Sequence, residues 1–374
     1  MLVRRGLLGI AVVPLLLAQC GPTQCAPPPP PPADIGAAWA SFDQDLSSRL
    51  LGGGASAASV AVSVDGTPVH AAAYGARLPW TGEPAEVGDQ FRVASISKTI
   101  TAIVVLQLVE AGWLGLDQAV GTTLAQRVGA SPVDGRVANI TVRQLLSHTS
   151  GLGTNELLVF GGYARTCPDA ARQALSASLV TTPGTTYVYA NLGYCLLGLL
   201  IEQVAGRSYE SVVRDQLLTP LGIGGMRVAG QNDVGDADVF HWALPNRNYM
   251  DVLGPAGSWI ASSSDVVRIL DSLDVGKPGF HPLSGATTDV MRQHRPFRYP
   301  SPDRWYGLGL ICFVDGTWGH TGTLESAHAM VLHRPDGITW SILVSGDTPK
   351  DSDELKAMFD DVITRAGVLP FLGR

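Results

Sequence analysis

Two hairpin patterns, one near each end of the chain, constrain the fold more than any other feature of the sequence. Residues 59–75 read SVAVSVDGTPVHAAAYG, in which two alternating runs are joined by Asp65-Gly66. Residues 328–346 read HAMVLHRPDGITWSILVSG, again two strand-like runs around a Pro-Asp-Gly turn. Alternating runs joined by a tight turn of this composition are typical of antiparallel hairpins. Strands from both ends of the chain are therefore expected to form one antiparallel sheet.

The segment between the hairpins has mostly helical patterns. Strand-like WYGLGLICFV and TWGHTGT precede the second hairpin. Apolar spacing predicts helices at 39–51, 96–108, 142–146, 168–180, 192–204, 209–217, 264–273 (capped by Ser264-Asp265) and 351–366. The predicted fold class is α+β, an antiparallel sheet flanked by the terminal helices with a mostly helical inserted lobe. The sheet lobe is expected at about 34–115 and 251–374, and the helical lobe at about 116–250.

The first 20 residues have the pattern of an export signal. Arg4 and Arg5 precede an apolar stretch at 7–18 that is too short to span a bilayer, and LAQCGP follows. Cys20 stands where a bacterial lipoprotein is cleaved and acylated, but Gln19 is larger than the small residue normal there. Secretion without a lipid is therefore the alternative to membrane attachment.

Residues 21–33 form a proline-rich linker, and the folded body is expected at 34–374. A polyproline segment suits a semi-rigid spacer between an anchor and a folded domain. The competing interpretation is that this proline-rich segment is a disordered remnant with no role. Either way, the leader places the protein in the cell envelope or outside the cell.

Composition excludes several classes of protein. With 374 residues, 45% hydrophobic and 16% charged, the chain is globular with ample core. The net charge of −7, without basic runs beyond Arg4-Arg5, argues against a nucleic-acid partner. The sequence has no CxxC or HExxH motif, so no metal and no other cofactor is expected.

Cys167 and Cys195 bracket one segment of the middle region. In an exported chain such a pair favours a disulfide, and two buried thiols are the alternative.

The sequence FRVASISK (91–98) places Ser95 three residues before Lys98, at the start of an apolar helix. Side chains three apart share a helix face, so the Lys98 amine can reach the Ser95 hydroxyl. A serine alcohol needs a neighbouring base to act as a nucleophile, and a desolvated lysine can be that base. The competing interpretation makes Ser95 a helix cap and Lys98 a solvated charge, and the motif alone does not decide between them.

Three further motifs follow in order: LLSHTSGL (145–152), PGTTYVYANLGYCLLG (183–198) and GHTG (319–322). Together with FRVASISK they resemble the serine beta-lactamase and penicillin-binding family, in its class C beta-lactamase and D-Ala-D-Ala carboxypeptidase branch. The resemblance covers roughly residues 36 to 366. It implies a beta-lactamase/transpeptidase-like fold and a serine hydrolase that works through an acyl-enzyme.

Carried over by position, the resemblance implies that Ser95 is the acylated nucleophile and Lys98 its partner. Tyr189 would be a general base and acid, and Asn191 would hydrogen-bond the substrate. His148 is interpreted as structural, its imidazole tying a helix end to a loop. Without the resemblance, Tyr189 would be interpreted as a packed aromatic.

The resemblance also implies a substrate-binding strand at His320, Thr321, Gly322 and Thr323. The backbone N–H groups of Ser95 and Thr323 would form the oxyanion hole. Class C beta-lactamases have lysine where this chain has His320. A permanent positive charge is thereby replaced by a group expected to titrate near neutrality, which argues against an efficient beta-lactamase.

The function expected first is therefore that of an exported serine hydrolase of D-alanyl-D-alanine carboxypeptidase type. The alternatives are a carboxylesterase or weak beta-lactamase on the same fold, and a non-catalytic envelope lipoprotein with a binding cleft. Expected partners are a peptidoglycan-type peptide, a small ester or a beta-lactam. Specificity is expected to lie in loops such as 153–166 and 227–255.

Overall fold

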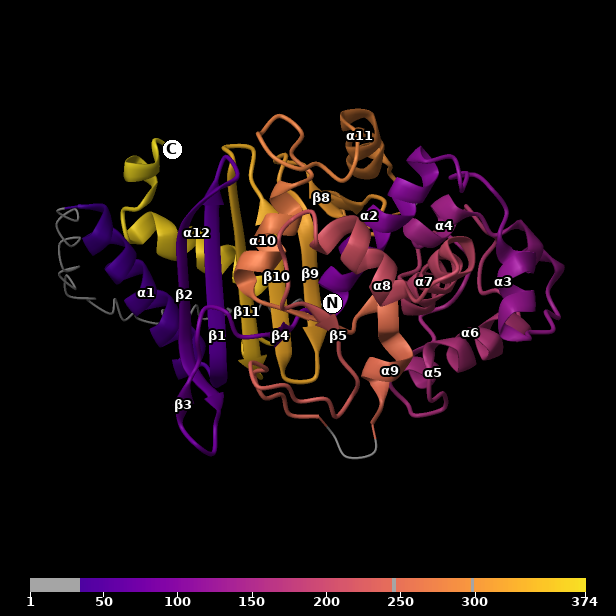
Figure 1. Cartoon of the computed structure of the whole chain (residues 1–374), viewed down its shortest axis with the longest axis horizontal. Coiled ribbons are helices and arrows are strands. Elements are labelled where there is room, and N and C mark those ends of the chain that lie inside the picture. The colour runs from indigo at the N-terminus through magenta and orange to yellow at the C-terminus, as the bar shows by residue number, and fades with distance from the viewer. Residues whose placement is uncertain (1–33, 244–246, 297–298) are drawn as a thin grey trace, which may run out of the picture.

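The computed structural model describes residues 34–243, 247–296 and 299–374, and the expected signal peptide, linker and Cys20 lie outside them. Its centre is one antiparallel sheet of eight strands in the order β3-β2-β1-β11-β10-β9-β8-β7 (Figure 1). The strands are β1 (Ala55–Val64), β2 (Thr67–Leu78), β3 (Glu83–Pro84), β7 (Arg304–Tyr306), β8 (Ile311–Phe313), β9 (Trp318–Leu324), β10 (Ala327–His333) and β11 (Ile338–Gly346). Because β1 pairs with β11, both ends of the chain share this sheet, and the predicted α+β fold is confirmed.

The first hairpin is closed by the predicted two-residue turn. Asp65 has φ 51° and Gly66 has φ 79°, the left-handed pair that a tight hairpin turn requires. In the second hairpin Gly337 supplies the positive φ, at 82°. These turns fix the registers of β1 with β2 and of β10 with β11, and the two hairpins meet where Val64 pairs with Ile338.

The two faces of the sheet differ in chemistry because side chains alternate along each strand. One face is strongly apolar and packs against α1 (Ile35–Gly52) and α12 (Glu354–Arg365), with Trp340 stacked on Phe359 at 4.2 Å. The other face carries small hydroxyl side chains under α10 (Ser263–Asp271), where Ser59 and Ser263 are hydrogen-bonded at 2.7 Å. The terminal helices therefore cover one face, as the sequence predicts.

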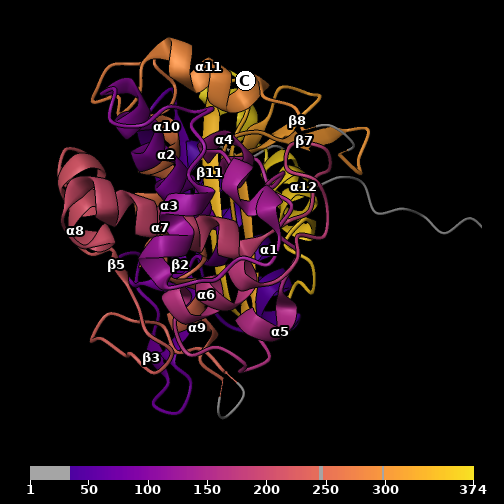
Figure 2. The same ribbon diagram turned by 90° about the vertical axis from the view of Figure 1, so that its right-hand side faces the viewer.

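The helical layer lies beside β9, on the right in Figure 1, and Figure 2 shows it from that side. Its helices are α2 (Ser97–Glu110), α3 (Gly121–Val128), α4 (Val142–Leu146), α5 (Glu156–Val159), α6 (Cys167–Ser176), α7 (Asn191–Ala205), α8 (Tyr209–Val213, continued as a π-turn) and α9 (Tyr249–Leu253). A further helix, α11 (Gly285–Gln293), precedes β7. None of the helices in the described ranges is long and apolar enough to cross a membrane.

A second sheet of three short strands was not predicted from the sequence. Its order is β4-β6-β5, formed by Phe91–Arg92, Trp259–Ala261 and Arg227–Val228. Runs of two or three residues are too short to give an alternating pattern. The pairing of β4 with β6 brings the residues before Ser95 next to the residues that follow Ala256.

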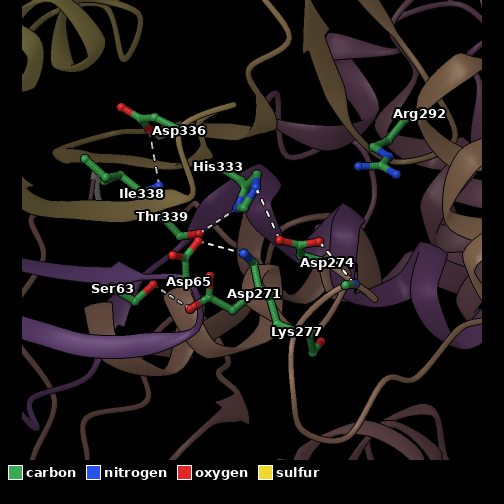
Figure 3. A network of polar contacts seen from close by, with 12 residues as sticks. Ser63, Asp65, Asp271, Asp274, Lys277, Arg292, His333, Asp336, Ile338 and Thr339 are labelled. Carbon is green, nitrogen blue, oxygen red and sulfur yellow. Dashed lines mark hydrogen bonds and ion pairs between the residues drawn. The ribbon is translucent and has the colours of Figure 1, made fainter. Parts of the chain in front are cut away.

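A polar network ties the segment after α10 to the sheet (Figure 3). Ser63 donates to the Asp271 carboxylate over 2.6 Å, and Lys277 donates to Asp65 over 2.7 Å. His333 contacts the Thr339 hydroxyl over 2.8 Å. In the β9–β10 register His333 lies opposite Trp318, so this network reaches the end of β9 that is away from Thr323.

Most predicted helix boundaries differ by a few residues from the structure, and two of the differences have a clear local reason. Helix α10 begins at Ser263, so its cap is Ser262 and not the predicted Ser264. The Ser262 hydroxyl accepts a hydrogen bond from the Asp265 N–H. The helix predicted at 168–180 ends at Ser176, where Ala177 turns to an extended conformation.

Candidate active site

Ser95 lies in a single 3₁₀ turn, Ala94–Ile96, between β4 and α2. Ala94 has φ 48°, a left-handed conformation that costs free energy for a residue with a side chain. The backbone of Gly322 lies directly against this turn. A Cβ at Gly322 would lie 2.3 Å from the Val93 carbonyl oxygen and 3.2 Å from the Ser95 nitrogen. Only glycine therefore allows β9 to approach Ser95 this closely.

Lys98 is fully buried in the first turn of α2. Its Nζ lies 2.9 Å from Ser95 Oγ and donates to the carbonyl oxygen of Ala256 over 2.7 Å. Across the described part of the chain no carboxylate pairs with it. Desolvation therefore holds the pKa of Lys98 well below its usual range. A lowered pKa makes the unprotonated amine, the form that can act as a base, more accessible.

Tyr189 approaches Ser95 from the extended segment before α7. Its hydroxyl donates to Ser95 Oγ over 2.8 Å, and Lys98 Nζ lies 4.9 Å from the centre of its ring. Burial raises the pKa of Tyr189, so the phenol stays protonated at neutral pH. The structure therefore brings Ser95, Lys98 and Tyr189 together, with one amine of lowered pKa and one protonated phenol on the same hydroxyl.

Asn191 is the first residue of α7, two positions after Tyr189. The structure gives its side-chain amide no hydrogen-bond partner within the described ranges, although only 7% of the residue is exposed. The amide is thus available for a ligand.

His320 differs from the expectation. It is buried, its Nδ1 lies 2.6 Å from the Thr321 carbonyl oxygen, and its Nε2 lies 3.0 Å from the Tyr306 hydroxyl. Burial, with a smaller effect of the nearby Lys98, lowers the pKa of His320 to about 3. The prediction that this position carries a charge titrating near neutrality is therefore wrong, because the ring faces Tyr306 in the interior and stays neutral.

The rest of the expected strand borders the site. β8 pairs with β9 only at Gly319 and Trp318, so the later residues of β9 have no strand neighbour on that side among those described. Thr321 is half-buried and Thr323 is exposed. The Thr323 hydroxyl contacts Ser352, whose own hydroxyl donates to the Gly322 carbonyl oxygen over 2.8 Å.

The motifs did not identify three groups around the site. They are the Ala256 carbonyl, the Ser352 hydroxyl and Tyr306, whose buried ring contacts Tyr194, His148 and His320, three residues that the motifs contain. A backbone carbonyl has no residue-type signal, and Ser352 is separated from Gly322 by two strands. Tyr306 could be located only by knowing that β7, α4 and α7 meet.

Cys167 and Cys195 form a disulfide that joins the start of α6 to the first half of α7. Their Cα atoms are 5.7 Å apart. Cys312 is a free, buried thiol on β8. No cluster of three or more His, Cys, Asp or Glu suited to a metal ion occurs in the described ranges.

Of the expected specificity loop 227–255, residues 229–243 line a pocket of about 270 Å³ next to β4. Buried Arg92 lines it and donates to the Gln231 carbonyl oxygen over 2.9 Å. The other wall includes Trp242, which is 68% exposed. This loop therefore forms a polar and aromatic wall beside the strand that leads to Ser95.

A family model described as Beta-lactamase matches residues 42–364. Penicillin-binding protein 4 of Amycolatopsis lactamdurans is 32% identical over 306 residues, which cover 75% of this chain and 74% of that protein. Esterase EstB of Burkholderia gladioli is 30% identical over 359 residues, covering 82% of this chain and 89% of that protein.

Solved structures with the same fold include D-amino acid amidase from Ochrobactrum anthropi SV3. It has a TM-score of 0.73 at 21% identity, covering 88% of this chain and 98% of the other. A D-stereospecific amidohydrolase from Streptomyces sp. has a TM-score of 0.67 at 26% identity, and the match covers 86% of this chain and 98% of the amidohydrolase chain.

Proposed function

We propose that this chain, which belongs to the beta-lactamase family of serine hydrolases, works through an acyl-enzyme on Ser95. The observation that carries the proposal is the contact of Ser95 Oγ with two buried groups, Lys98 Nζ at 2.9 Å and the Tyr189 hydroxyl at 2.8 Å. A serine hydroxyl becomes nucleophilic when a positioned base accepts its proton. A purely structural lysine would not need to be buried without a counter-ion.

In the proposed mechanism Lys98 is the base and Tyr189 the proton donor. Lys98 Nζ accepts the Ser95 proton as Oγ bonds the substrate carbonyl carbon. The tetrahedral oxyanion then lies near the backbone N–H groups of Ser95 and Thr323. Collapse breaks the bond to the leaving group, which takes the Tyr189 proton, and the Lys98 ammonium returns a proton to Tyr189. Water then hydrolyses the ester on Ser95.

The substrate class proposed first is a peptide of D-amino acids, in the manner of a D-alanyl-D-alanine carboxypeptidase. The open side of β9 beyond Gly319 supports it, because an extended peptide can pair along an unpaired strand. The names of the penicillin-binding protein, D-amino acid amidase and D-stereospecific amidohydrolase point to the same chemistry. The amide of Asn191 would bind the acyl part of such a peptide.

A carboxylesterase is the second candidate, and one observation favours it. His320 is neutral, so the strand offers no fixed cation at that position for the terminal carboxylate of a peptide. An uncharged ester needs no such cation, and Esterase EstB is similar over most of its length. The same absence of charge limits beta-lactam hydrolysis to a weak activity. A non-catalytic binding role is disfavoured because Ser95, Lys98 and Tyr189 remain in contact.

We propose further that the protein is exported and held at the membrane by a lipid on Cys20. The sequence of residues 1–33 supports this proposal, with secretion as the alternative. Partitioning of the native protein between detergent and water tests it. A mature form found wholly in the aqueous phase rules out the anchor.

The test of the function is intact mass after exposure to benzylpenicillin and, separately, to a p-nitrophenyl ester. One acyl group is expected on the wild type with at least one reagent. Ser95→Ala, which keeps Lys98 and Tyr189 in place, should remain unmodified and folded. A wild type that is never acylated, or an adduct that persists in Ser95→Ala, would overturn the proposal. Turnover of a D-alanyl-D-alanine peptide against a neutral ester then separates the two substrate classes.

A further inference from the structure

His148 holds both residues that flank Tyr189. The N–H of Val188 donates to the His148 carbonyl oxygen over 2.9 Å. The N–H of Ala190 donates to Nδ1 of the His148 ring over 3.0 Å. A single residue therefore fixes the backbone immediately before and immediately after Tyr189.

The His148 ring also supports Tyr189 directly. The two ring centres are 4.3 Å apart with the planes inclined by 37°, and His148 is 1% exposed. Ring packing limits the tilt of the phenol, while the two backbone bonds limit its displacement. The Tyr189 hydroxyl must stay 2.8 Å from Ser95 Oγ, so small shifts of this segment would break that contact.

The hydrogen bonding of the ring fixes its proton. Because the Ala190 N–H is a donor, Nδ1 must be an acceptor, and the neutral ring carries its proton on Nε2. Nε2 is buried and has no hydrogen-bond partner within the described ranges. The imidazole thus uses only Nδ1, and a side chain that places an acceptor at the same point should replace it.

The backbone of His148 is also specialised. Its φ is 58°, in the left-handed region that is uncommon for residues other than glycine and that histidine, asparagine and aspartate adopt more often than most. This turn lets the carbonyl oxygen and the ring of one residue face the same segment. A strained conformation of this kind is retained where surrounding contacts hold it.

We propose that His148 is a positioning residue for Tyr189, holding the phenol where it delivers a proton to the leaving group. This proposal rests on the proposed function, because it assigns Tyr189 to leaving-group protonation. A purely structural His148 would tie a helix end to a loop and affect mainly folding. The proposal is more specific, because it says that His148 affects the proton transfer from Tyr189 to the leaving group.

The matched variants are His148→Asn and His148→Gln. The asparagine Oδ1 occupies nearly the place of Nδ1, and asparagine suits the positive φ, so the acceptor is kept. The glutamine amide reaches the place of Nε2 and leaves the Ala190 N–H without its acceptor. His333→Gln is the control for loss of a buried imidazole, since His333 contacts Thr339 at the far end of the sheet.

The readout is the dependence of acylation on the leaving group. A p-nitrophenolate ion departs without a proton, whereas an amine must be protonated as it leaves. His148→Gln should therefore acylate within about threefold of wild type with a p-nitrophenyl ester. With an amide of the same acyl group it should be slower by about tenfold to 100-fold, in the range expected for impaired general acid catalysis. Tyr189→Phe should show the same selective loss for the amide.

His148→Asn and His333→Gln should keep wild-type rates on both substrates, and the thermal midpoints of all variants are measured in parallel. Equal losses on ester and amide in folded His148→Gln, or an equal amide defect in His148→Asn, would overturn the proposal. If the glutamine variant does not fold, His148→Leu is the acceptor-free comparison. A wild type that forms no adduct on Ser95 instead refutes the proposed function, so the two failures are distinguishable.

Discussion

Lys98 Nζ and the carbonyl oxygen of Ala256 are 2.7 Å apart, so one N–H of the amine is bound by a backbone group that cannot ionise. A carboxylate at the same place would hold Lys98 as an ammonium ion by its opposite charge. A carbonyl fixes the direction of the amine without that charge. The lone pair of the neutral amine is then free to accept the proton of Ser95, 2.9 Å away.

Buried neutral histidines should make the fold sensitive to acid. Burial lowers the pKa of His320 and of His241 to about 3, from 6.5 for a free side chain. A depressed histidine pKa contributes stability that is present above pH 6.5 and is lost as the pH falls toward 3. His320→Gln keeps an acceptor for Tyr306 but cannot ionise. Between pH 6 and pH 4 its free energy of unfolding should fall less steeply, by about 1.4 kcal/mol per pH unit.

Urea unfolding at pH 7, 6, 5 and 4 measures this difference. Identical slopes for wild type and His320→Gln would mean that His320 is not buried and neutral in the folded protein.

Ser352→Ala should lower kcat and leave KM unchanged. The Ser352 hydroxyl donates over 2.8 Å to the Gly322 carbonyl, which belongs to the same peptide unit as the Thr323 N–H expected in the oxyanion hole. Loss of one such hydrogen bond is worth about 1 kcal/mol, or five- to tenfold in rate. Ser352→Thr should restore the rate. Steady-state kinetics decide: a rise in KM at constant kcat would place Ser352 in substrate binding instead.

Removal of the disulfide should destabilise the fold more than it slows the reaction. Cys167 and Cys195 are 28 residues apart in sequence, and closing a loop of that size stabilises by about 3.6 kcal/mol. The double variant Cys167→Ser, Cys195→Ser should unfold at lower urea concentration. Alkylation of the denatured, exported wild type is the companion measurement, and two free thiols there would contradict the pairing.

The sequence predicts those parts of the fold that have a local signal. Asp65-Gly66 and Gly337 fix hairpin turns because few residues adopt positive φ, and alternation along β1 and β11 marks strands with two different faces. The short strands of the second sheet have no such signal, since their pairing depends on tertiary contacts.

In the active site, too, features with a local sequence signal could be predicted, and features that depend on packing could not. The spacing of Ser95 and Lys98 indicates their contact, because residues three apart share a helix face. The state of His320 could not be predicted, because its charge depends on burial beside Tyr306, a residue from another strand. His148 is visible in the sequence as part of a motif, but its bonds to Val188 and Ala190 depend on the packing of two distant segments.

The central claim is that Lys98 accepts the proton of Ser95, and Lys98→Arg tests it most directly. Arginine keeps its charge at any working pH, so it supplies a basic residue that cannot act as a base. Lys98→Met is the control for folding, because methionine fills a similar volume without a charge. Loss of general-base assistance is expected to slow acylation by about 10²–10⁴ in both variants.

The measurement is single-turnover acylation of Ser95 by an activated ester, with thermal midpoints in parallel. The account predicts slow acylation in folded Lys98→Arg at every pH. It also predicts, for the wild type, a pH profile whose basic form appears well below the usual pKa of lysine. A Lys98→Arg rate within about threefold of wild type, less than 1 kcal/mol of barrier, would contradict the assignment of Lys98 as the base.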